Sequence, residues 1–242
     1  ACRKDDITFK EAVKEWGGNL DAYEKALLKP GAYKCFAEMH IEQGKVLEET
    51  GNQIGIVHNI AAPTRFKLHI TGMADHSGAT PMGFRKDALV SAAKLVLAVE
   101  TAAINEKDNG TVGTVGIVEV DPGSINVVPG KVTLWVDVRG VNTESIQRTL
   151  KEIRQAVQGT ARTDGVEIKE EMLTSDTPVA LDEKLAAQSE AICTEQKKSF
   201  LHMNSGAGHD AMHMPAICPT TMLFIPCKGG ISHNPEEFAK TK

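Results

Sequence analysis

The sequence predicts an α/β protein in which a compact two-layer domain is inserted between two pieces of a second domain. Two observations support this prediction. Between residues 61 and 174 the apolar pattern follows the order β-α-β-β-α-β, which is the ferredoxin-like plan. On either side, residues 1–60 and 175–242 combine apolar strand patterns with glycine-containing turns, as expected for two pieces of one α/β domain.

Six segments make up the inserted domain. The first alternates apolar and polar residues, which indicates a strand, and the second is rich in Ala, Leu and Val, which favours a helix. We expect strands at 65–71, 111–120, 131–139 and 166–172, and helices at 87–105 and from Asn142 or Thr143 to about 157. One face of the four-stranded sheet is then covered by two helices.

The flanking pieces contain fewer elements. Apolar residues at helical spacing predict a helix at about 9–28, and Pro30 with Gly31 ends it. Further elements are expected as strands at 35–41, 54–60 and 219–226 and a helix at 182–197. Asn234 and Pro235 are typical of a helix start. Since the chain opens without Met and closes soon after Pro235, we expect it to be cut at both ends.

Composition excludes several classes of protein. The formal net charge of -5 argues against a general nucleic-acid binder. We recognise no apolar run long enough to cross a bilayer, and no leader. The five cysteines are odd in number and form no CxxC pair. We therefore expect each cysteine to be a small buried residue of a protein in the reducing cytoplasm, and we expect no disulfide framework.

Four histidines lie in glycine-rich segments or at strand ends: His40, His76, His209 and His233. Loops beyond strand ends are where α/β enzymes place their sites, and imidazole is a good ligand for zinc. No HExxH or HxH spacing is present. Taken singly, each of these histidines is more often structural than functional.

Two further residues have an open interpretation. Arg139 ends a predicted strand, where its guanidinium could grip a carboxylate or form a surface ion pair. Asn126 is either a turn residue or a substrate contact. The residue types alone do not separate these alternatives.

Six segments together resemble one family of enzymes. They follow one another in the order in which that family has them, and they span nearly the whole chain. The segments are HIEQG at 40–44, DHSGATPM at 75–82, NVVPG at 126–130, DVR at 137–139, SGAGHD at 205–210 and GISHNPEE at 230–237. The chain thus resembles the allantoate amidohydrolase and N-carbamoyl-L-amino-acid hydrolase family, of the two-zinc exopeptidase and aminoacylase group.

The resemblance implies a fold, a cofactor and a partner. The fold is a zinc-exopeptidase-like catalytic domain, here partial, at 1–60 and 175–242, with an inserted ferredoxin-like lid and dimerisation domain at 61–174. The cofactors are two divalent ions, zinc or manganese, and the partners are a second copy of the chain and a small ureido substrate that carries a carboxylate.

The same resemblance assigns roles by position. His40 and His233 are the expected metal ligands, and His76 is the expected catalytic donor to the developing oxyanion. Substrate contacts are expected from Gln43, His76, Asn126, Arg139, Gly208 and His209. Some contacts from the lid are expected to come from the partner subunit.

One departure from the family is large. Its first His-x-Asp pair, its Glu-Glu pair and its final helix have no counterpart among the 242 residues. The pairs supply further metal ligands and the general base, and they are expected before residue 1. Since catalytic zinc needs about three protein ligands, we expect the chain alone to bind metal poorly or not at all, and to catalyse nothing.

The expected reaction of the whole protein is hydrolysis of the carbamoyl C–N bond of allantoate or an N-carbamoyl-L-amino acid. A ureidoglycolate-like substrate has the same two groups. The alternatives are a metallo-dipeptidase or aminoacylase of the same larger group, and a fragment that serves only for dimerisation. Neither the ureido substrate nor the metal follows from the sequence.

Overall fold

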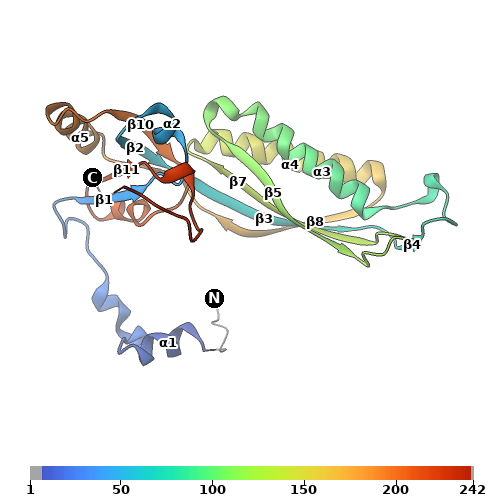
Figure 1. Ribbon diagram of the computed structural model, residues 1–242. Helices are drawn as coiled ribbons and strands as arrows, with labels where there is room; N and C mark the ends of the chain where they lie inside the picture. Colours follow the sequence, from blue (N-terminus) through green and yellow to red (C-terminus); the bar gives the residue numbers. More distant parts are fainter. Residues whose placement is uncertain (1–6, 241–242) are drawn as a thin grey trace.

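The computed structural model describes residues 7–240 and has two main sheets (Figure 1). The first has the strand order β1-β11-β2-β10, with β9 pairing with β2, and the second has the order β5-β7-β3-β8. The chain passes between the sheets twice, from β2 (Ile54–Ile60) into β3 (Ala62–Thr71), and from β8 (Glu167–Ser175) into β9 (Val179–Ala180).

The second sheet and its helices have the predicted β-α-β-β-α-β order. The elements are β3, α3 (Ala88–Asn105), β5 (Val112–Asp121), β7 (Lys131–Gly140), α4 (Thr143–Asp164) and β8. All three strand pairs in this sheet are antiparallel. Asp87 caps α3 by accepting from the amides of Leu89 and Val90, and Asn142 caps α4 by accepting from the amide of Ser145. Both helices therefore begin within one residue of the predicted positions.

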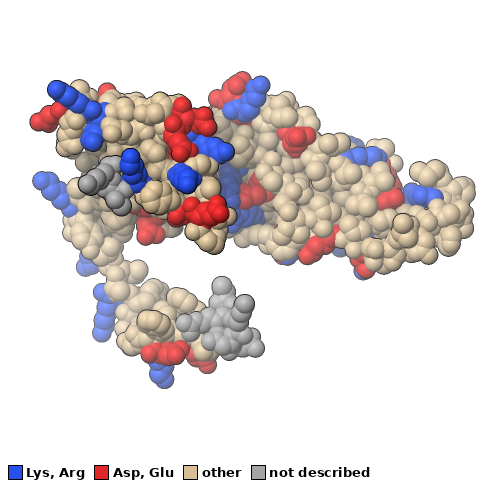
Figure 2. Space-filling view, viewed as in Figure 1, with Lys and Arg blue, Asp and Glu red and all other residues tan. Residues whose placement is uncertain are grey.

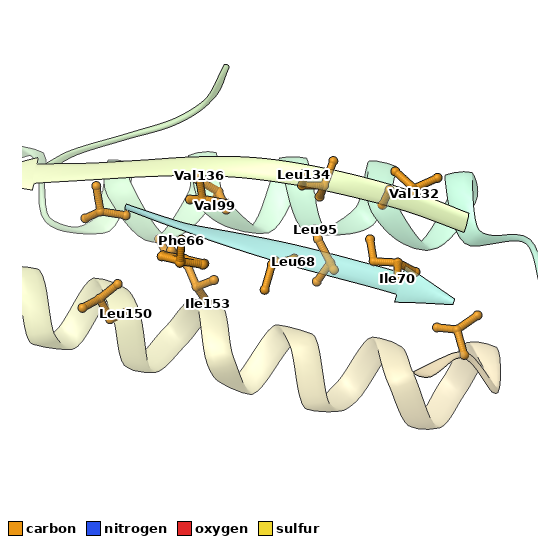
Figure 3. Close-up of a cluster of buried hydrophobic side chains, with 14 of the residues drawn as sticks. Phe66, Leu68, Ile70, Leu95, Val99, Val132, Leu134, Val136, Leu150 and Ile153 are labelled. Carbon is orange, nitrogen blue, oxygen red and sulfur yellow. The ribbon is translucent and has the colours of Figure 1, made fainter. Parts of the chain in front are cut away.

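Figure 3 shows why α3 and α4 lie on one face of this sheet. Alternate residues of β3 and β7 point toward the helices because side chains alternate across a strand. They meet Leu95 and Val99 of α3 and Leu150 and Ile153 of α4 in one buried cluster. The strand residues of the cluster are Phe66, Leu68, Ile70, Val132, Leu134, Val136 and Val138. Burial of each such side chain stabilises the fold by about 1.5–3 kcal/mol.

One expectation from composition is wrong for α3. Its 18 residues are long and apolar enough to match a membrane span. However, Ala88, Ala92, Leu95 and Val99 are buried against the sheet, which is the usual place of a core helix in a globular protein.

The first sheet is built from both flanking pieces of the chain. β1 (Phe36–Ile41) pairs in parallel with β11 (Thr220–Ile225), β11 pairs antiparallel with β2, and β2 pairs in parallel with β10 (Phe200–Ser205). Its core contains Val57, Met222 and Phe224, together with Leu47 of α2 (Val46–Thr50). The helix α5 (Glu183–Glu195) packs against β2 and β11.

Short elements connect these layers. They are η1 (Leu20–Ala26), β4 (Asp75–His76), η2 (Met82–Phe84), η3 (Lys107–Asn109), β6 (Val127–Val128), η4 (Asp210–Met212), η5 (Met214–Ala216) and η6 (Lys228–Gly230). Figure 2 shows the second sheet and its helices as an arm that projects from the first sheet, with basic and acidic side chains interspersed on this face.

Two helix predictions are wrong. The segment expected as one helix at 9–28 forms α1 (Phe9–Glu15) and the separate η1. Gly17, with a φ of 80°, lies between them, and the amides of Gly17 and Gly18 donate to the carbonyls of Lys14 and Val13 at the end of α1. No helix forms at Asn234 among the described residues. The strand β10 was not predicted, and Cys2 lies outside the described residues. The other four cysteines are free thiols.

The last turn of α3 is tied to α4 by a bidentate ion pair. Nε and Nη2 of Arg148 donate to the two carboxylate oxygens of Glu106, at 2.6 and 2.8 Å. Hydrogen bonds from Arg148, and then from Ser145, lower the pKa of Glu106 from 4.5 to about 2. The ionised carboxylate therefore stabilises the folded state above pH 4.5, and this contribution is lost as the pH falls toward 2.

Replacement of Glu106 by Gln tests this ion pair. We expect E106Q to lower the melting temperature at pH 6–7, because one charge partner of Arg148 is lost. The difference from the parent chain should shrink as the pH falls through about 4 toward 2. Circular dichroism melts across this range measure it, with Glu100→Gln, an exposed acid of the same helix, as the control. A difference that does not change with pH would contradict the assignment.

Candidate functional site

Two parallel strands bring the first pair of site segments to one edge of the first sheet. His40 pairs with Phe224, so β1 and β11 end side by side. The turn at 42–44 follows β1, and the loop that carries His233 follows β11. Because the carboxyl ends of parallel strands meet at the same edge, both loops lie where α/β proteins place their sites.

Gln43 connects these two loops. Its Nε2 donates to Oγ of Ser232 at 2.9 Å and lies 3.3 Å from Nε2 of His233. Gln43 and His233 both have left-handed backbone, with φ of 57° and 58°. Among the described residues, Lys197 is the only other non-glycine residue with a positive φ. Such strained backbone concentrates at functional sites.

The loops also approach backbone to backbone. A Cβ added to Gly230 would lie 2.8 Å from the carbonyl carbon of Gly44 and 2.6 Å from Cγ of Lys45. Gly230 also has a φ of 66°. Only glycine fits this position without displacing the turn that carries Gln43.

His40 is oriented by its own strand. Its Nδ1 lies 2.8 Å from the carbonyl oxygen of Ile41. When Nδ1 carries the proton and donates to this oxygen, Nε2 has a free lone pair. A backbone carbonyl that orients an imidazole in this way is common behind a metal ligand. The ring centroid of His40 lies 4.7 Å from that of His209.

His209 is buried beneath the SGAGHD turn. Its Nε2 lies 2.7 Å from Oγ of Ser205, and its Nδ1 lies 3.9 Å from a carboxylate oxygen of Glu38. Burial, and then the neighbouring His40, lower the pKa of His209 to about 4, while Asp210 acts in the opposite direction. The imidazole is therefore neutral at pH 7, and its contact with Glu38 is not an ion pair.

Glu38 and Ser205 were not singled out from the sequence. Glu38 precedes His40 by two residues on β1, so both side chains point to the same face. Its other carboxylate oxygen accepts from the amide of Ala211 at 2.7 Å. Ser205 ends β10 and belongs to the same turn as His209. The alternation of β1 could have revealed Glu38, whereas the contact of Ser205 depends on how the turn folds back.

Arg139 links the second sheet to this turn. Its Nη1 lies 3.4 Å from the carbonyl oxygen of Gly206. Its Nε and Nη2 donate to the carboxylate of Asp137, at 2.8 Å for the shortest contact. This carboxylate also accepts from Nε of Arg65 at 3.0 Å. Burial raises the pKa of Asp137, but hydrogen bonds from Arg139 and Arg65 outweigh it and lower the pKa. Gly208 is exposed in the turn beside Gly206.

His76 and Asn126 lie together, but at the opposite end of the second sheet (Figure 1). His76 pairs with Val127, and Asn126 accepts through its carbonyl from the amide of Ser77. Nδ1 of His76 accepts from the amides of Gly78 and Ala79, at 3.1 Å each. The proton is therefore on Nε2, and the exposed ring can donate from that atom.

The length of β7 gives the distance between Arg139 and the end that carries His76 within one chain. Lys131 lies at the end near His76, and Arg139 lies eight residues further along the same strand. At ~3.3 Å per residue this is about 26 Å. A single chain therefore gathers His40, Gln43, His209 and His233 with Arg139 at one end, and His76 with Asn126 at the other.

A complete metal cluster is not present in residues 7–240, where no group of three His, Cys, Asp or Glu side chains is arranged to hold an ion. Of the two imidazoles expected as ligands, His40 has its Nδ1 at the Ile41 carbonyl oxygen, and His233 has its Nε2 beside Nε2 of Gln43. The segments that the resemblance places before residue 1 stay a prediction.

A mixed α/β fold with imidazoles gathered where parallel strands end is the architecture of many α/β enzymes. The chain matches the model of peptidase family M20/M25/M40 over residues 10–242, and it belongs to this family. The family is generally metal-dependent.

Similar proteins have been named as amidohydrolases. The chain is 37% identical to N-carbamoyl-L-amino-acid amidohydrolase of Pseudomonas sp., 39% to ureidoglycolate hydrolase of Arabidopsis thaliana and 34% to allantoate amidohydrolase of Escherichia coli. These matches cover 97–98% of the chain. The fold is similar to the crystal structure of AtUAH in complex with glyoxylate, with a TM-score of 0.83 and 37% identity over 98% of this chain and 57% of that one.

The chain spans only part of these relatives. It covers 58%, 50% and 57% of the length of the three amidohydrolases. The family match and these relatives confirm the resemblance that the six sequence segments indicated.

Gly230 offers a test of the contact between the two loops. We expect Gly230→Ala to cost about 1 kcal/mol for the left-handed backbone and a further ~1–3 kcal/mol because the added carbon meets Gly44. Gly229→Ala is the matched control, since its φ is 64° but its nearest neighbour would be 3.6 Å away. Urea unfolding of both variants measures the difference. Equal losses would show that the loops do not touch there.

Proposed function

We propose that the protein containing this chain hydrolyses the carbamoyl C–N bond of a small ureido compound that carries a carboxylate. The observation that carries the proposal is the contact of Arg139 with the Gly206 carbonyl. It brings a carboxylate-binding guanidinium to the turn whose His209 ring touches His40. Relatives named for N-carbamoyl amino acids, allantoate and ureidoglycolate support the reaction class.

We propose the following division of labour. Residues 1–60 and 175–242 are pieces of a catalytic domain, and residues 61–174 are a ferredoxin-like lid that also dimerises. The antiparallel strand order β5-β7-β3-β8 with two helices on one face supports the lid. The separation of His76 from His40 supports dimerisation, because a lid tip that cannot reach its own site can serve that of a partner.

The residues present fit a divalent metal, because His40 and His233 both lie where the parallel strands β1 and β11 end. These two would each hold one of two ions, zinc or manganese, and the remaining ligands and the general base would come from outside the 242 residues. When bound, such ions lower the pKa of a water molecule and polarise a carbonyl group. The chain by itself is expected to be inactive.

The remaining side chains would position the substrate. Arg139 would bind its carboxylate with the guanidinium edge that faces away from Asp137. Gln43, held by Ser232, would contact the ureido group, and the turn at Gly208 and His209 would line the pocket. The Nε2 proton of His76 and the side chain of Asn126, from the partner's lid, would donate to the oxygen on which negative charge develops, a contribution often worth ~3 kcal/mol.

Arg139→Ala tests the proposed clamp in the complete protein. We expect kcat/KM for N-carbamoyl amino acids, allantoate and ureidoglycolate to fall about 100-fold, because the substrate is no longer oriented. Arg154→Ala is the matched control, since Arg154 also pairs with a carboxylate of this sheet, that of Glu170 at 2.8 Å. An unchanged kcat/KM in R139A would rule out the clamp. Preferential cleavage of dipeptides would favour the metallo-dipeptidase alternative.

Complementation tests whether His76 acts on a partner's site. His40→Ala and His76→Ala variants of the complete protein should each be inactive. After dissociation and mixing, about a quarter of the parent activity should return, since half of the dimers are mixed and each has one intact site. If His76 served its own chain, no mixed dimer would contain an intact site and no activity would return. Light scattering confirms that dimers reform.

A further inference from the structure

The face of the second sheet opposite α3 and α4 contains a pocket, and Arg139 is the one lining residue to which the proposed function gives a role. Its volume is about 410 Å³, within the range of small-molecule sites. Residues of all four strands line it, alternating with those that are buried under the helices. The lining side chains include Arg65, Val112, Ile117, Trp135, Asp137, Arg139 and Leu173.

One wall of the pocket is apolar and exposed. Ile117 is 48% exposed, Leu173 43% and Val112 59%. Val112 and Ile117 come from β5 and Leu173 comes from β8, and Ile117 pairs with Trp135 of β7. Nζ of Lys67 lies 4.1 Å from the centre of this indole ring. Apolar side chains gathered in one concave surface are typical of a binding site, whereas single exposed ones are ordinary.

The other end of the pocket is positively charged. Asp137 accepts hydrogen bonds from both Arg65 and Arg139, so two guanidinium groups share one carboxylate and leave one net positive charge. The shared carboxylate holds both guanidinium groups in place and leaves further N–H donors on each of them. A preorganised guanidinium pair of this kind suits an organic carboxylate.

The pocket is continuous with the candidate site. Arg139 lines the pocket and also reaches the Gly206 carbonyl. A ligand whose carboxylate lies at Arg139 can therefore point one substituent toward the turn of His209 and another along the sheet toward Trp135. These are the two directions that the carbamoyl group and the side chain of an amino-acid derivative need.

We propose that this pocket binds the side chain of an N-carbamoyl amino acid and selects branched aliphatic or aromatic side chains. Arg65 is a second carboxylate-binding residue beside Arg139. The proposal rests on the proposed function and narrows its substrate class, because allantoate and ureidoglycolate offer no apolar group to Trp135, Ile117 and Leu173.

The 242-residue chain contains every residue of this pocket, so its binding is testable without activity. Of its two tryptophans, Trp16 is 81% exposed, and Trp16→Phe leaves Trp135 as the sole tryptophan, which excitation at the red edge of the absorption band selects over tyrosine. The probes are N-carbamoyl-L-leucine, N-carbamoylglycine, which lacks the side chain, and N-carbamoyl-L-leucinamide, which lacks the carboxylate. We expect the first to change the emission of Trp135 and to bind roughly tenfold or more tightly than either of the others.

Variants of neighbouring residues separate the pocket from general effects. Ile117→Ser should remove most of the difference in affinity between N-carbamoyl-L-leucine and N-carbamoylglycine. Val118→Ser should keep it, because Val118 is equally exposed at 48% but does not line the pocket. Arg65→Gln should weaken the binding of both probes that carry a carboxylate, N-carbamoyl-L-leucine and N-carbamoylglycine. Arg154→Gln should leave the binding of both unchanged.

Three results would overturn the proposal. Equal affinity for the leucine and glycine derivatives would show that the apolar wall binds no side chain, and the amidohydrolase function would still stand on the assay of R139A. Equal affinity for N-carbamoyl-L-leucinamide and N-carbamoyl-L-leucine would show that Arg65 does not bind the carboxylate. No binding of any probe would show that the pocket is not a side-chain site, and light scattering that shows I117S more monomeric than the parent would then assign the face to a second copy of the chain.

Discussion

The ten-residue antiparallel ladder between β3 and β7 is the constraint on which the arrangement of the site depends. It pairs Ala62 with Gly140 at one end and Thr71 with Lys131 at the other. A one-residue slip of β3 against β7 would turn Phe66 away from the helices and bring Arg65 toward them instead. The same register therefore fixes the hydrophobic core, the direction of Arg139 and the distance from Arg139 to the tip that carries His76.

The two ends of this ladder have different chemistry. At the end nearest the first sheet, Asp137 lies between Arg65 and Arg139, and the neutral His209 contacts Ser205. At the tip, His76 has its acceptor nitrogen satisfied by backbone amides, and Arg85 donates to the carbonyls of Ser77 and Thr80 that complete the turn. Each end is ordered by its own hydrogen bonds, so neither requires the other for its local shape.

The sequence predicts the second sheet well because local patterns decide it. Period-two alternation in β3 and β7 and the caps Asp87 and Asn142 are local signals. The break between α1 and η1 depends on the left-handed backbone at Gly17, and β10 contains His202 and Asn204, whose polar side chains weaken the apolar pattern of a strand. In the site, His40 and His233 follow from the resemblance, but the contacts of Glu38, Ser205 and Arg65 depend on tertiary packing. The separation of His76 from Arg139 likewise required the strand register.

The two chain crossings between the sheets, at Ile60–Ala62 and Ser175–Val179, make the second sheet and its helices a lever with its fulcrum beside Gly206. A rotation of only about 10° at those crossings sweeps an arm of about 26 Å through roughly 5 Å at its far end. The same rotation moves Arg139, close to the fulcrum, by much less. Motion of this kind would displace His76 by several times more than Arg139.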